Sequence, residues 1–250
     1  MTGPSSDLAR DDIETLHGAA LDTALARRFT LADDSVVIGA STFLLRKPAN
    51  ADHLISEADY VMDERLPYWA DLWPSARVLA HALLVERGDG RTLLELGCGL
   101  GLPTVAAMRA GFHVTATDYY QDALHVTRAN AGRNLQREPH VQLVNWRRWP
   151  EAFGPFDYVV AADVVYEPEY ATLVAECIAK ALAPDGIALI ADPGRVALPV
   201  FLAHLPDLGL VVRETTSTPY RDGAINQTIQ LFRLGWATDA ERPASRTVAP

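Results

Sequence analysis

Cysteine is scarce in this chain, because Cys98 and Cys177 are the only two thiols among 250 residues. Two isolated cysteines at this spacing build neither a disulfide framework nor a metal site. No apolar run approaches the roughly 18 residues that a membrane helix needs. No basic-then-apolar signal segment is recognised at the start of the sequence. We therefore expect a soluble, cytoplasmic protein of a reducing compartment.

Positive charge is also in deficit, with 22 Lys and Arg against 32 Asp and Glu and a formal net charge of −10. Lysine occurs only at Lys47 and Lys180. Nucleic-acid binding draws on clustered lysine and arginine, so this balance argues against a nucleic-acid partner. Cationic partners fit an acidic surface better. We expect a monomer with no membrane partner and no metal.

The chain divides into three parts by its patterns. Residues 1–65 read as an N-terminal extension, in which "RFTLADDSVVIGASTFLLRKP" predicts a β-hairpin around a turn that contains the two adjacent aspartates. Residues 66–234 form the main domain, and a helix begins at Pro74 and ends before Gly88. Residues 235–250 are predicted to be a disordered tail.

Short apolar runs alternate with helix-length segments from residue 91 onward. The candidate strands are "TLLELG", "HVTATD", "VQLVN", "DYVVAAD" and "IALIAD". Each segment between them is long enough for a crossover, which predicts an α/β fold with a mostly parallel sheet. The last two strands, "LVVRETTSTPY" and "NQTIQLFRL", have too few residues between them for a helix and should pair antiparallel.

A glycine loop, "ELGCGLGLP", follows the first of these strands and opens a helix. Gly97, Gly99 and Gly101 allow the backbone to turn tightly and approach a ligand. Leu102 stands where a dinucleotide fingerprint needs glycine or alanine, and no Walker lysine follows. Glu95 would repel a diphosphate but could accept hydrogen bonds from a ligand amine. The loop therefore does not favour a pyrophosphate ligand.

Asp118 ends the second strand, 21 residues after Gly97. At the same sheet edge as the glycine loop, an acid suits the hydroxyls of a ribose. Taken alone, Asp118 could equally cap the following helix. The two features together favour a nucleoside ligand that carries no phosphates.

The combination of "LELGCGLG" and Asp118 resembles the class I S-adenosylmethionine-dependent methyltransferases, over roughly residues 70–234. The resemblance implies a Rossmann-like, doubly wound seven-stranded sheet with an antiparallel last strand. It also implies S-adenosyl-L-methionine as cofactor, with the loop backbone against the methionine part and Asp118 on the ribose. Trp146 and Asn145 stand where this class contacts adenine, although Trp146 could also be a core residue.

Two further stretches narrow the resemblance. "YWADLWPSA" and "DVVY", together with the hairpin, resemble the D-x-x-Y protein lysine methyltransferases of family 16. In that family the tryptophan matching Trp73 contributes to the cofactor pocket, whereas Trp69 could be a packing residue. The cofactor site that the resemblance implies consists of Trp73, Glu95, Gly97, Cys98, Gly99, Gly101, Asp118, Asn145, Trp146 and Ala162.

Asp163 and Tyr166 of "DVVY" are the predicted catalytic residues. Asp163 ends the fourth candidate strand, where doubly wound sheets bind ligands. A carboxylate there can orient an amine for in-line methyl transfer, and a phenol three residues later can line a narrow passage. An isolated aspartate at this place could instead be an N-cap.

We expect an N-methyltransferase whose substrate is a lysine side chain of a protein. A small amine or an N-heterocycle is the alternative substrate, and a non-catalytic cofactor-binding interaction module is the alternative of another class. Val164 and Val165 stand where the N/D-P-P-Y pattern of base or glutamine methylation needs prolines. Neither the acid and histidine cluster of metal-dependent catechol methylation nor the Pro-Cys nucleophile of pyrimidine C5 methylation is found.

Overall fold

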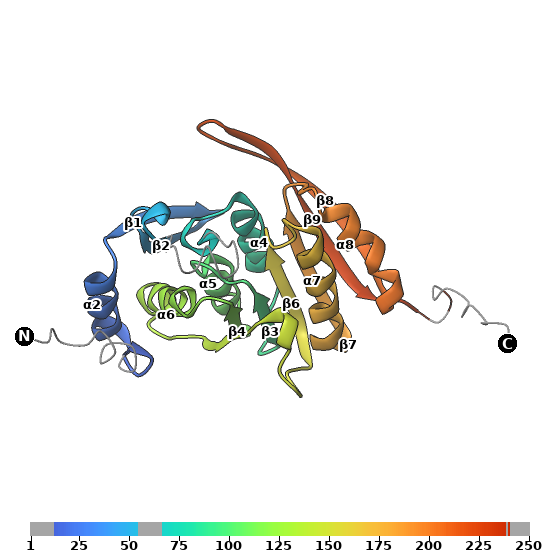
Figure 1. Ribbon diagram of the computed structural model, residues 1–250, viewed down its shortest axis with the longest axis horizontal. Coiled ribbons are helices and arrows are strands. Elements are labelled where there is room, and N and C mark those ends of the chain that lie inside the picture. Colours follow the sequence, from blue (N-terminus) through green and yellow to red (C-terminus); the bar gives the residue numbers. More distant parts are fainter. Residues whose placement is uncertain (1–12, 55–66, 239, 241–250) are drawn as a thin grey trace, which may run out of the picture.

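A computed structural model describes residues 13–54, 67–238 and 240 of the chain (Figure 1). At its centre is a seven-stranded sheet in the order β5-β4-β3-β6-β7-β9-β8. Strands β3 to β7 run parallel, whereas β9 is antiparallel to β7 and β8. The predicted α/β fold is confirmed. The strands are β3 (Thr92–Leu96), β4 (His113–Asp118), β5 (His140–Leu143), β6 (Phe156–Ala162), β7 (Leu182–Asp192), β8 (Leu210–Asp222) and β9 (Ile225–Trp236).

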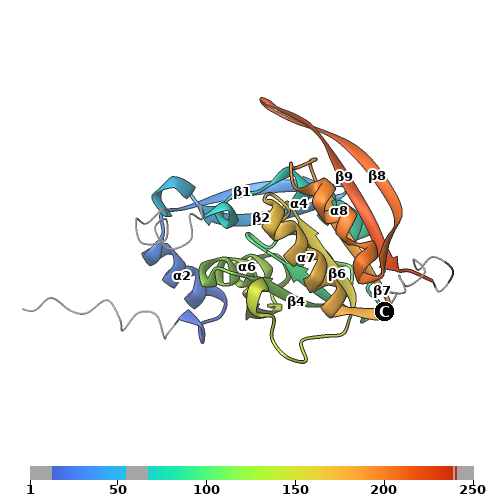
Figure 2. The same ribbon diagram turned by 45° about the vertical axis from the view of Figure 1, so that its right-hand side comes forward.

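Helices bury both faces of the sheet, because successive strand side chains point to opposite sides. Leu94 and Leu96 belong to the core beneath α7 (Pro168–Ala181) and α8 (Leu198–His204). Leu93 belongs to the opposite core, beneath α4 (Pro74–Val85) and α5 (Leu102–Arg109). Helix α6 (Gln121–Leu135) packs beside α5, and Figure 2 shows α7 and α8 together on their side of the sheet. Burial on both faces explains why the strands read as continuous apolar runs.

The N-terminal extension consists of α2 (Gly18–Arg28) and a hairpin of β1 (Leu31–Ile38) and β2 (Ser41–Pro48). The hairpin is confirmed, but the predicted turn at the two aspartates is wrong. Asp33 and Asp34 lie within β1, and the turn is at Gly39 and Ala40, where Gly39 adopts φ +58°. Glycine tolerates that left-handed backbone best. Asp33 instead forms an ion pair with Arg46 across the hairpin.

Two asparagines of α6 hold this hairpin against the main domain. The Asn134 amide accepts a hydrogen bond from the Leu44 backbone N–H and donates to the Leu44 carbonyl, both at 2.9 Å. The Asn130 amide makes the same pair of bonds with Arg46, at 2.7 and 3.0 Å. The side chains thus take the place of a third strand, and they satisfy backbone groups that an edge strand leaves unpaired.

The hairpin of β8 and β9 extends beyond the rest of the sheet. Asp192, the last residue of β7, pairs with Gln230 of β9, so residues 218–229 project past the carboxyl ends of the parallel strands (Figure 1). We call residues 218–229 the arm. Gly235 and Trp236 belong to β9, so the predicted disorder is wrong for these two residues. Residues 239 and 241–250 lie outside the described part of the chain.

Two expectations about absent features can be compared with the described residues. Cys98 and Cys177 are both buried and form no disulfide. Within residues 13–54, 67–238 and 240, no helix combines the length and the apolar character that crossing a bilayer requires.

Gly101 and Gly223 provide a test of how tightly the glycine loop is packed. Both have positive φ, at +78° and +55°, but a Cβ on Gly101 would lie 2.7 Å from Thr127 Oγ1, whereas Gly223 faces open space. A left-handed backbone costs a non-glycine residue about 1–2 kcal/mol, and overpacking adds about 1–3 kcal/mol. We therefore expect Gly101→Ala to lower the free energy of unfolding clearly more than Gly223→Ala does, as measured by urea denaturation. Equal losses would show that the Thr127 contact relaxes freely.

Candidate functional site

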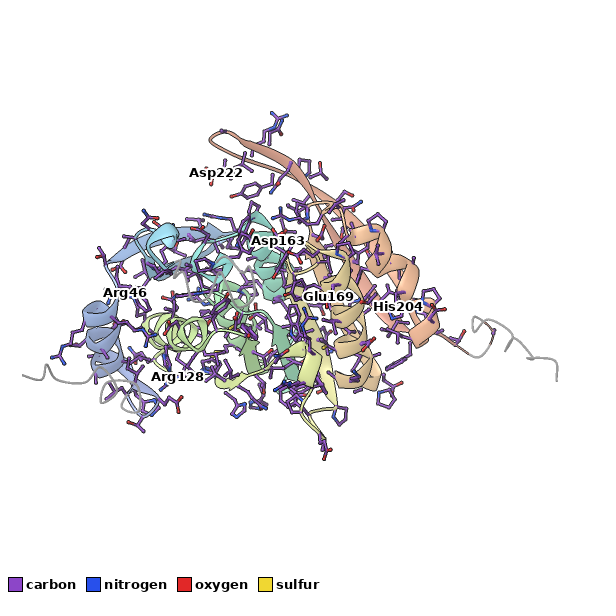
Figure 3. The ribbon with its side chains drawn as sticks, viewed as in Figure 1. Arg46, Arg128, Asp163, Glu169, His204 and Asp222 are labelled. Atoms are coloured by element: carbon purple, nitrogen blue, oxygen red, sulfur yellow. The ribbon has the colours of Figure 1, made fainter. Side chains whose placement is uncertain are left out.

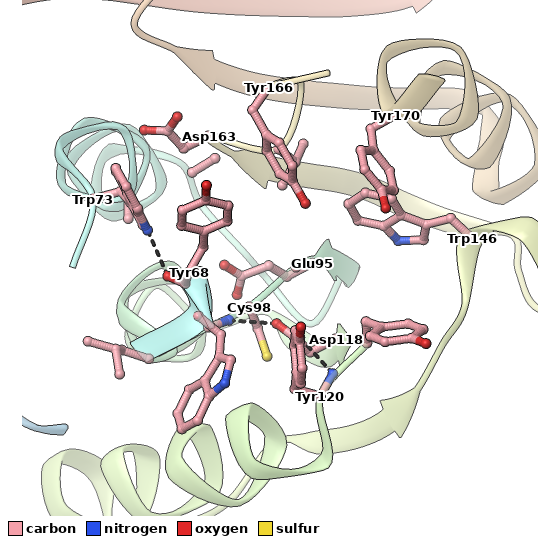
Figure 4. Close-up of a pocket in the computed structure, with 18 of the residues that line it drawn as sticks. Tyr68, Trp73, Glu95, Cys98, Asp118, Tyr120, Trp146, Asp163, Tyr166 and Tyr170 are labelled. Carbon is pink, nitrogen blue, oxygen red and sulfur yellow. Dashed lines mark hydrogen bonds between the residues drawn. The ribbon is translucent and has the colours of Figure 1, made fainter. Parts of the chain in front are cut away.

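A single pocket collects the predicted site residues at the carboxyl ends of β3, β4 and β6. Its volume is about 500 Å³, within the range of small-molecule sites. Every residue of the predicted site lines it except Gly101 (Figure 4). The parallel strands bring these residues together, because each strand delivers its terminal residue to the same edge of the sheet.

The glycine loop forms the floor of this pocket. Gly97, Gly99 and Gly101 all adopt positive φ, between +51° and +78°. A Cβ at Gly97 would lie 3.1 Å from Val164 Cγ1, and one at Gly99 would lie 3.2 Å from the Trp69 carbonyl oxygen. Gly101 does not line the pocket. It lies against Thr127 of α6, and the missing Cβ allows α5 to approach α6. The loop is thus shaped by its protein neighbours on one side and exposes its backbone to the pocket on the other.

Asp118 organises the loops around that floor. Its side chain accepts hydrogen bonds from the backbone N–H groups of Gly99 and Tyr120, both at 3.0 Å. The N-cap of α6 is Tyr120, so Asp118 is not itself the capping residue. Burial raises the pKa of Asp118, although these N–H groups act in the opposite direction.

Glu95 lies behind the loop and is 1% exposed. It accepts a hydrogen bond from the Thr104 hydroxyl. Burial raises its pKa to about 8, and the nearby Asp118 carboxylate contributes to the increase. The pocket therefore contains two buried acids whose charged forms a cationic ligand would stabilise.

Five aromatic rings form a continuous wall around the rest of the pocket (Figure 4). Tyr68 contacts Trp73 and Tyr166, with ring centroids 5.8 and 5.6 Å apart. Tyr166 contacts Tyr170 at 5.2 Å, and Tyr170 contacts Trp146 at 6.1 Å. Edge and tilted arrangements of this kind stabilise ring pairs. All five residues line the pocket.

Asp163 follows β6 in a left-handed conformation, with φ +61°. Its carboxylate accepts hydrogen bonds from Arg195 Nε at 2.7 Å and from the Ser75 hydroxyl at 3.1 Å. The side chain of Asp163 is 2% exposed. Helix α7 begins at Pro168 with Glu167 as N-cap, so the alternative that Asp163 caps this helix is wrong.

Several residues of this site were not predicted from the sequence. Tyr68, Tyr120 and Tyr170 line the pocket, and Ser75 and Arg195 hold Asp163. Tyr170 stands four residues after Tyr166, a spacing that could have suggested a pair, although Tyr166 precedes α7 and only Tyr170 lies within it. Nothing in the sequence signals that Arg195, 32 residues beyond Asp163, reaches its carboxylate. Trp69 belongs to the core between α2 and α6, as the packing alternative proposed.

A family model described as lysine methyltransferase matches residues 68–197. The chain belongs to this family. The lysine methyltransferase match includes the aromatic wall, the glycine loop and the D-x-x-Y segment. The protein is therefore an S-adenosylmethionine-dependent class I methyltransferase, as the sequence predicted. Its seven-stranded sheet agrees with that class.

Individual relatives agree with the family match. The chain is 31% identical to an electron transfer flavoprotein beta subunit lysine methyltransferase from Xenopus laevis, over 66% of this chain and 69% of that protein. It is 36% identical to the protein-lysine methyltransferase METTL21E of Bos taurus, over 40% of this chain and 38% of that protein. The alignment thus spans well under half of the bovine protein.

A solved structure shows the same fold. The ribosomal protein L11 methylase from Lactobacillus delbrueckii subsp. bulgaricus aligns with a TM-score of 0.51 at 20% identity, over 66% of this chain and 77% of that one. At this identity the likeness concerns the fold alone.

Asp118 can be tested by its effect on cofactor affinity. We expect Asp118→Ala to weaken S-adenosylmethionine binding by about 1–3 kcal/mol, because the hydrogen-bonding partners of the carboxylate are left unpaired. Isothermal titration calorimetry measures this change. Asp157→Ala is a matched control. Asp157 accepts hydrogen bonds from Thr92 at the amino ends of β6 and β3, away from the carboxyl ends that form the pocket. Equal affinity for the folded Asp118→Ala variant and wild type would remove Asp118 from the cofactor site.

Glu95 should make the stability of the ligand-free protein fall with rising pH. Its pKa is about 8 in the folded chain and about 4.3 when unfolded. Between these values the folded state holds a proton that the unfolded state has released, so stability decreases as pH rises from about 5 to about 8. Glu95→Gln should show a shallower decrease in melting temperature over this range, although the raised pKa of Asp118 leaves some slope of the same sign. Identical slopes would mean that Glu95 titrates normally.

Proposed function

We propose that this enzyme methylates the side-chain amine of a lysine in a protein. The observation that carries the proposal is the position of the D-x-x-Y segment, whose Asp163 and Tyr166 line the pocket beside the glycine loop. The activities for which relatives such as the Xenopus laevis and Bos taurus enzymes are named support a protein lysine as substrate.

The cofactor side of the pocket fits a ligand with a ribose and positive charge. In this proposal Asp118 binds the ribose hydroxyls, and Glu95 with the glycine-loop backbone faces the methionine part. Trp146 flanks the adenine, and Asn145 keeps its NH₂ group for the base, because its oxygen already accepts from the Arg147 N–H at 3.0 Å. Cys98, Ala162 and Trp73 complete the wall. When bound, S-adenosylmethionine supplies an electrophilic methyl group on a sulfonium.

The substrate side has to accept an amine and remove its charge. A protonated lysine has no lone pair, so it must lose a proton before it can attack a methyl group. Enclosure by the rings of Tyr68, Tyr166 and Tyr170 disfavours the charged amine and lowers its pKa. A carboxylate offers about four lone-pair positions, and Asp163 uses two of them for Arg195 and Ser75. The remaining positions can accept hydrogen bonds from the amine and orient it.

Transfer of a labelled methyl group to a lysate separates the possible functions. The enzyme is incubated with S-adenosylmethionine tritiated on the methyl group and a cell lysate, and label is counted in the protein and small-molecule fractions. We expect label in discrete protein bands, with mass spectrometry locating it on lysine. Label confined to small molecules would favour an amine or N-heterocycle substrate. Cofactor binding without transfer would indicate an interaction module.

Asp163→Asn tests whether this carboxylate acts on the amine. Asparagine tolerates the left-handed backbone as well as aspartate does, and Arg195 is 35% exposed, so water can solvate it when the ion pair is lost. We expect the melting temperature and cofactor affinity to stay near wild type. Methyl transfer should fall by about two orders of magnitude, as losses of positioned acid–base groups do. Near-normal turnover would reduce Asp163 to a structural residue.

Tyr166→Phe asks whether the phenol hydroxyl or only the ring matters. The ring contacts of Tyr166 with Tyr68 and Tyr170 should survive in the variant. If the ring shapes the passage, the rate of transfer should fall by less than about tenfold, clearly less than in Asp163→Asn. A loss as large as that of Asp163→Asn would instead assign a proton-transfer or hydrogen-bonding role to the hydroxyl.

A further inference from the structure

Arg195 lies outside the pocket lining, yet it contacts two residues that line it. Its Nε donates to Asp163 Oδ1 at 2.7 Å. Its guanidinium carbon lies 5.2 Å from the centroid of the Trp73 ring, a cation–π distance. Asp163 follows β6 and Trp73 precedes α4, so one side chain joins two separate elements beside the pocket. Asp163 lies on the Trp73 side of the pocket in Figure 4 and centrally in the molecule in Figure 3.

The turn after β7 fixes where Arg195 begins. Asp192 is 0% exposed, and its Oδ1 accepts hydrogen bonds from the backbone N–H groups of Gly194 and Arg195, both at 2.7 Å. Gly194 adopts φ +88°, which glycine tolerates without strain. The start of the Arg195 side chain is thus set by a buried carboxylate of the sheet, rather than by a loose surface loop.

Asp163 is held in a conformation that needs such support. A non-glycine residue at φ +61° persists only where its surroundings determine it. The backbone N–H of Asp163 donates to the Ala191 carbonyl at 2.9 Å, which ties it to β7. Ser75 and Arg195 then fix one carboxylate oxygen each. The free lone pairs of Asp163 are therefore directed by its partners and not by its own rotamer preference.

We propose that Arg195 is a positioning residue for methyl transfer, acting through Asp163. This inference rests on the proposed function of the pocket. The planar guanidinium can hydrogen-bond the carboxylate while it stacks on the indole, a combination that lysine cannot reproduce. Arg195 thereby aligns the group that orients the amine with the ring that borders the cofactor side. It touches neither the amine nor the transferred methyl group.

The test compares rates of tritium transfer into the lysate proteins that the wild-type enzyme labels. Labelling by the wild-type enzyme is measured first and tests the proposed function. A failure of the proposed function is thereby distinguished from a failure of the role proposed for Arg195. Arg195→Ala should reduce the rate of methyl transfer by about tenfold or more at a lysate concentration that saturates the enzyme. Its affinity for S-adenosylhomocysteine, measured by calorimetry, should be unchanged. Arg195→Lys should recover only part of the loss. Arg233→Ala is the matched control, because Arg233 is 30% exposed and pairs with Glu86 at 2.6 Å, away from the pocket lining.

A double-mutant cycle distinguishes positioning from a purely structural ion pair. If Arg195 acts through Asp163, Arg195→Ala should change the rate of the Asp163→Asn enzyme by less than about threefold. Full multiplication of the two losses would overturn the proposal, as would wild-type turnover by folded Arg195→Ala. If Arg195→Ala does not fold, Arg195→Lys decides, and a wild-type rate for that variant overturns the proposal.

Discussion

The site depends on how one aspartate ties three loops together. Asp118 holds the glycine loop through the Gly99 N–H and the start of α6 through the Tyr120 N–H. Its own carbonyl oxygen accepts a hydrogen bond from the Val144 N–H at 2.9 Å, which fixes the chain after β5. The loops that follow β3, β4 and β5 therefore meet at a single residue. That junction adds to the contacts that the glycine loop makes with Thr117 and Thr127.

Charge is distributed unevenly around this junction. Glu95 and Asp118 are buried near the glycine loop, and burial raises the pKa of both. Asp163, by contrast, is paired with Arg195. In the proposed function, the first two acids face the positive charges of the cofactor, and the paired carboxylate faces an amine that must lose its charge. One pocket thereby provides two electrostatic environments a short distance apart.

The sequence predicted the sheet and most of the pocket because both follow from local patterns. The glycine loop and Asp118 stand at strand ends, and parallel strands place such ends together. The turn of the N-terminal hairpin was wrong because Asp33 pairs across strands with Arg46, a tertiary contact that overrides the turn preference of aspartate. Arg195 was not predicted either, because its contact is also tertiary. Its contact with Asp163 depends on the placement of β7 beside β6, which no pattern within "DPGR" encodes.

The arm also bears on how the protein avoids sticking to copies of itself. Among the residues that the structure describes, β8 is the last strand of the sheet, and its outer backbone groups face no further strand. Pro219 lies within β8 and has no N–H to donate. Glu214, Arg221 and Asp222 add charge along the same strand. A second molecule that tried to extend the sheet would lose a ladder bond at Pro219 and desolvate these charges. The long free edge is thereby protected against aggregation.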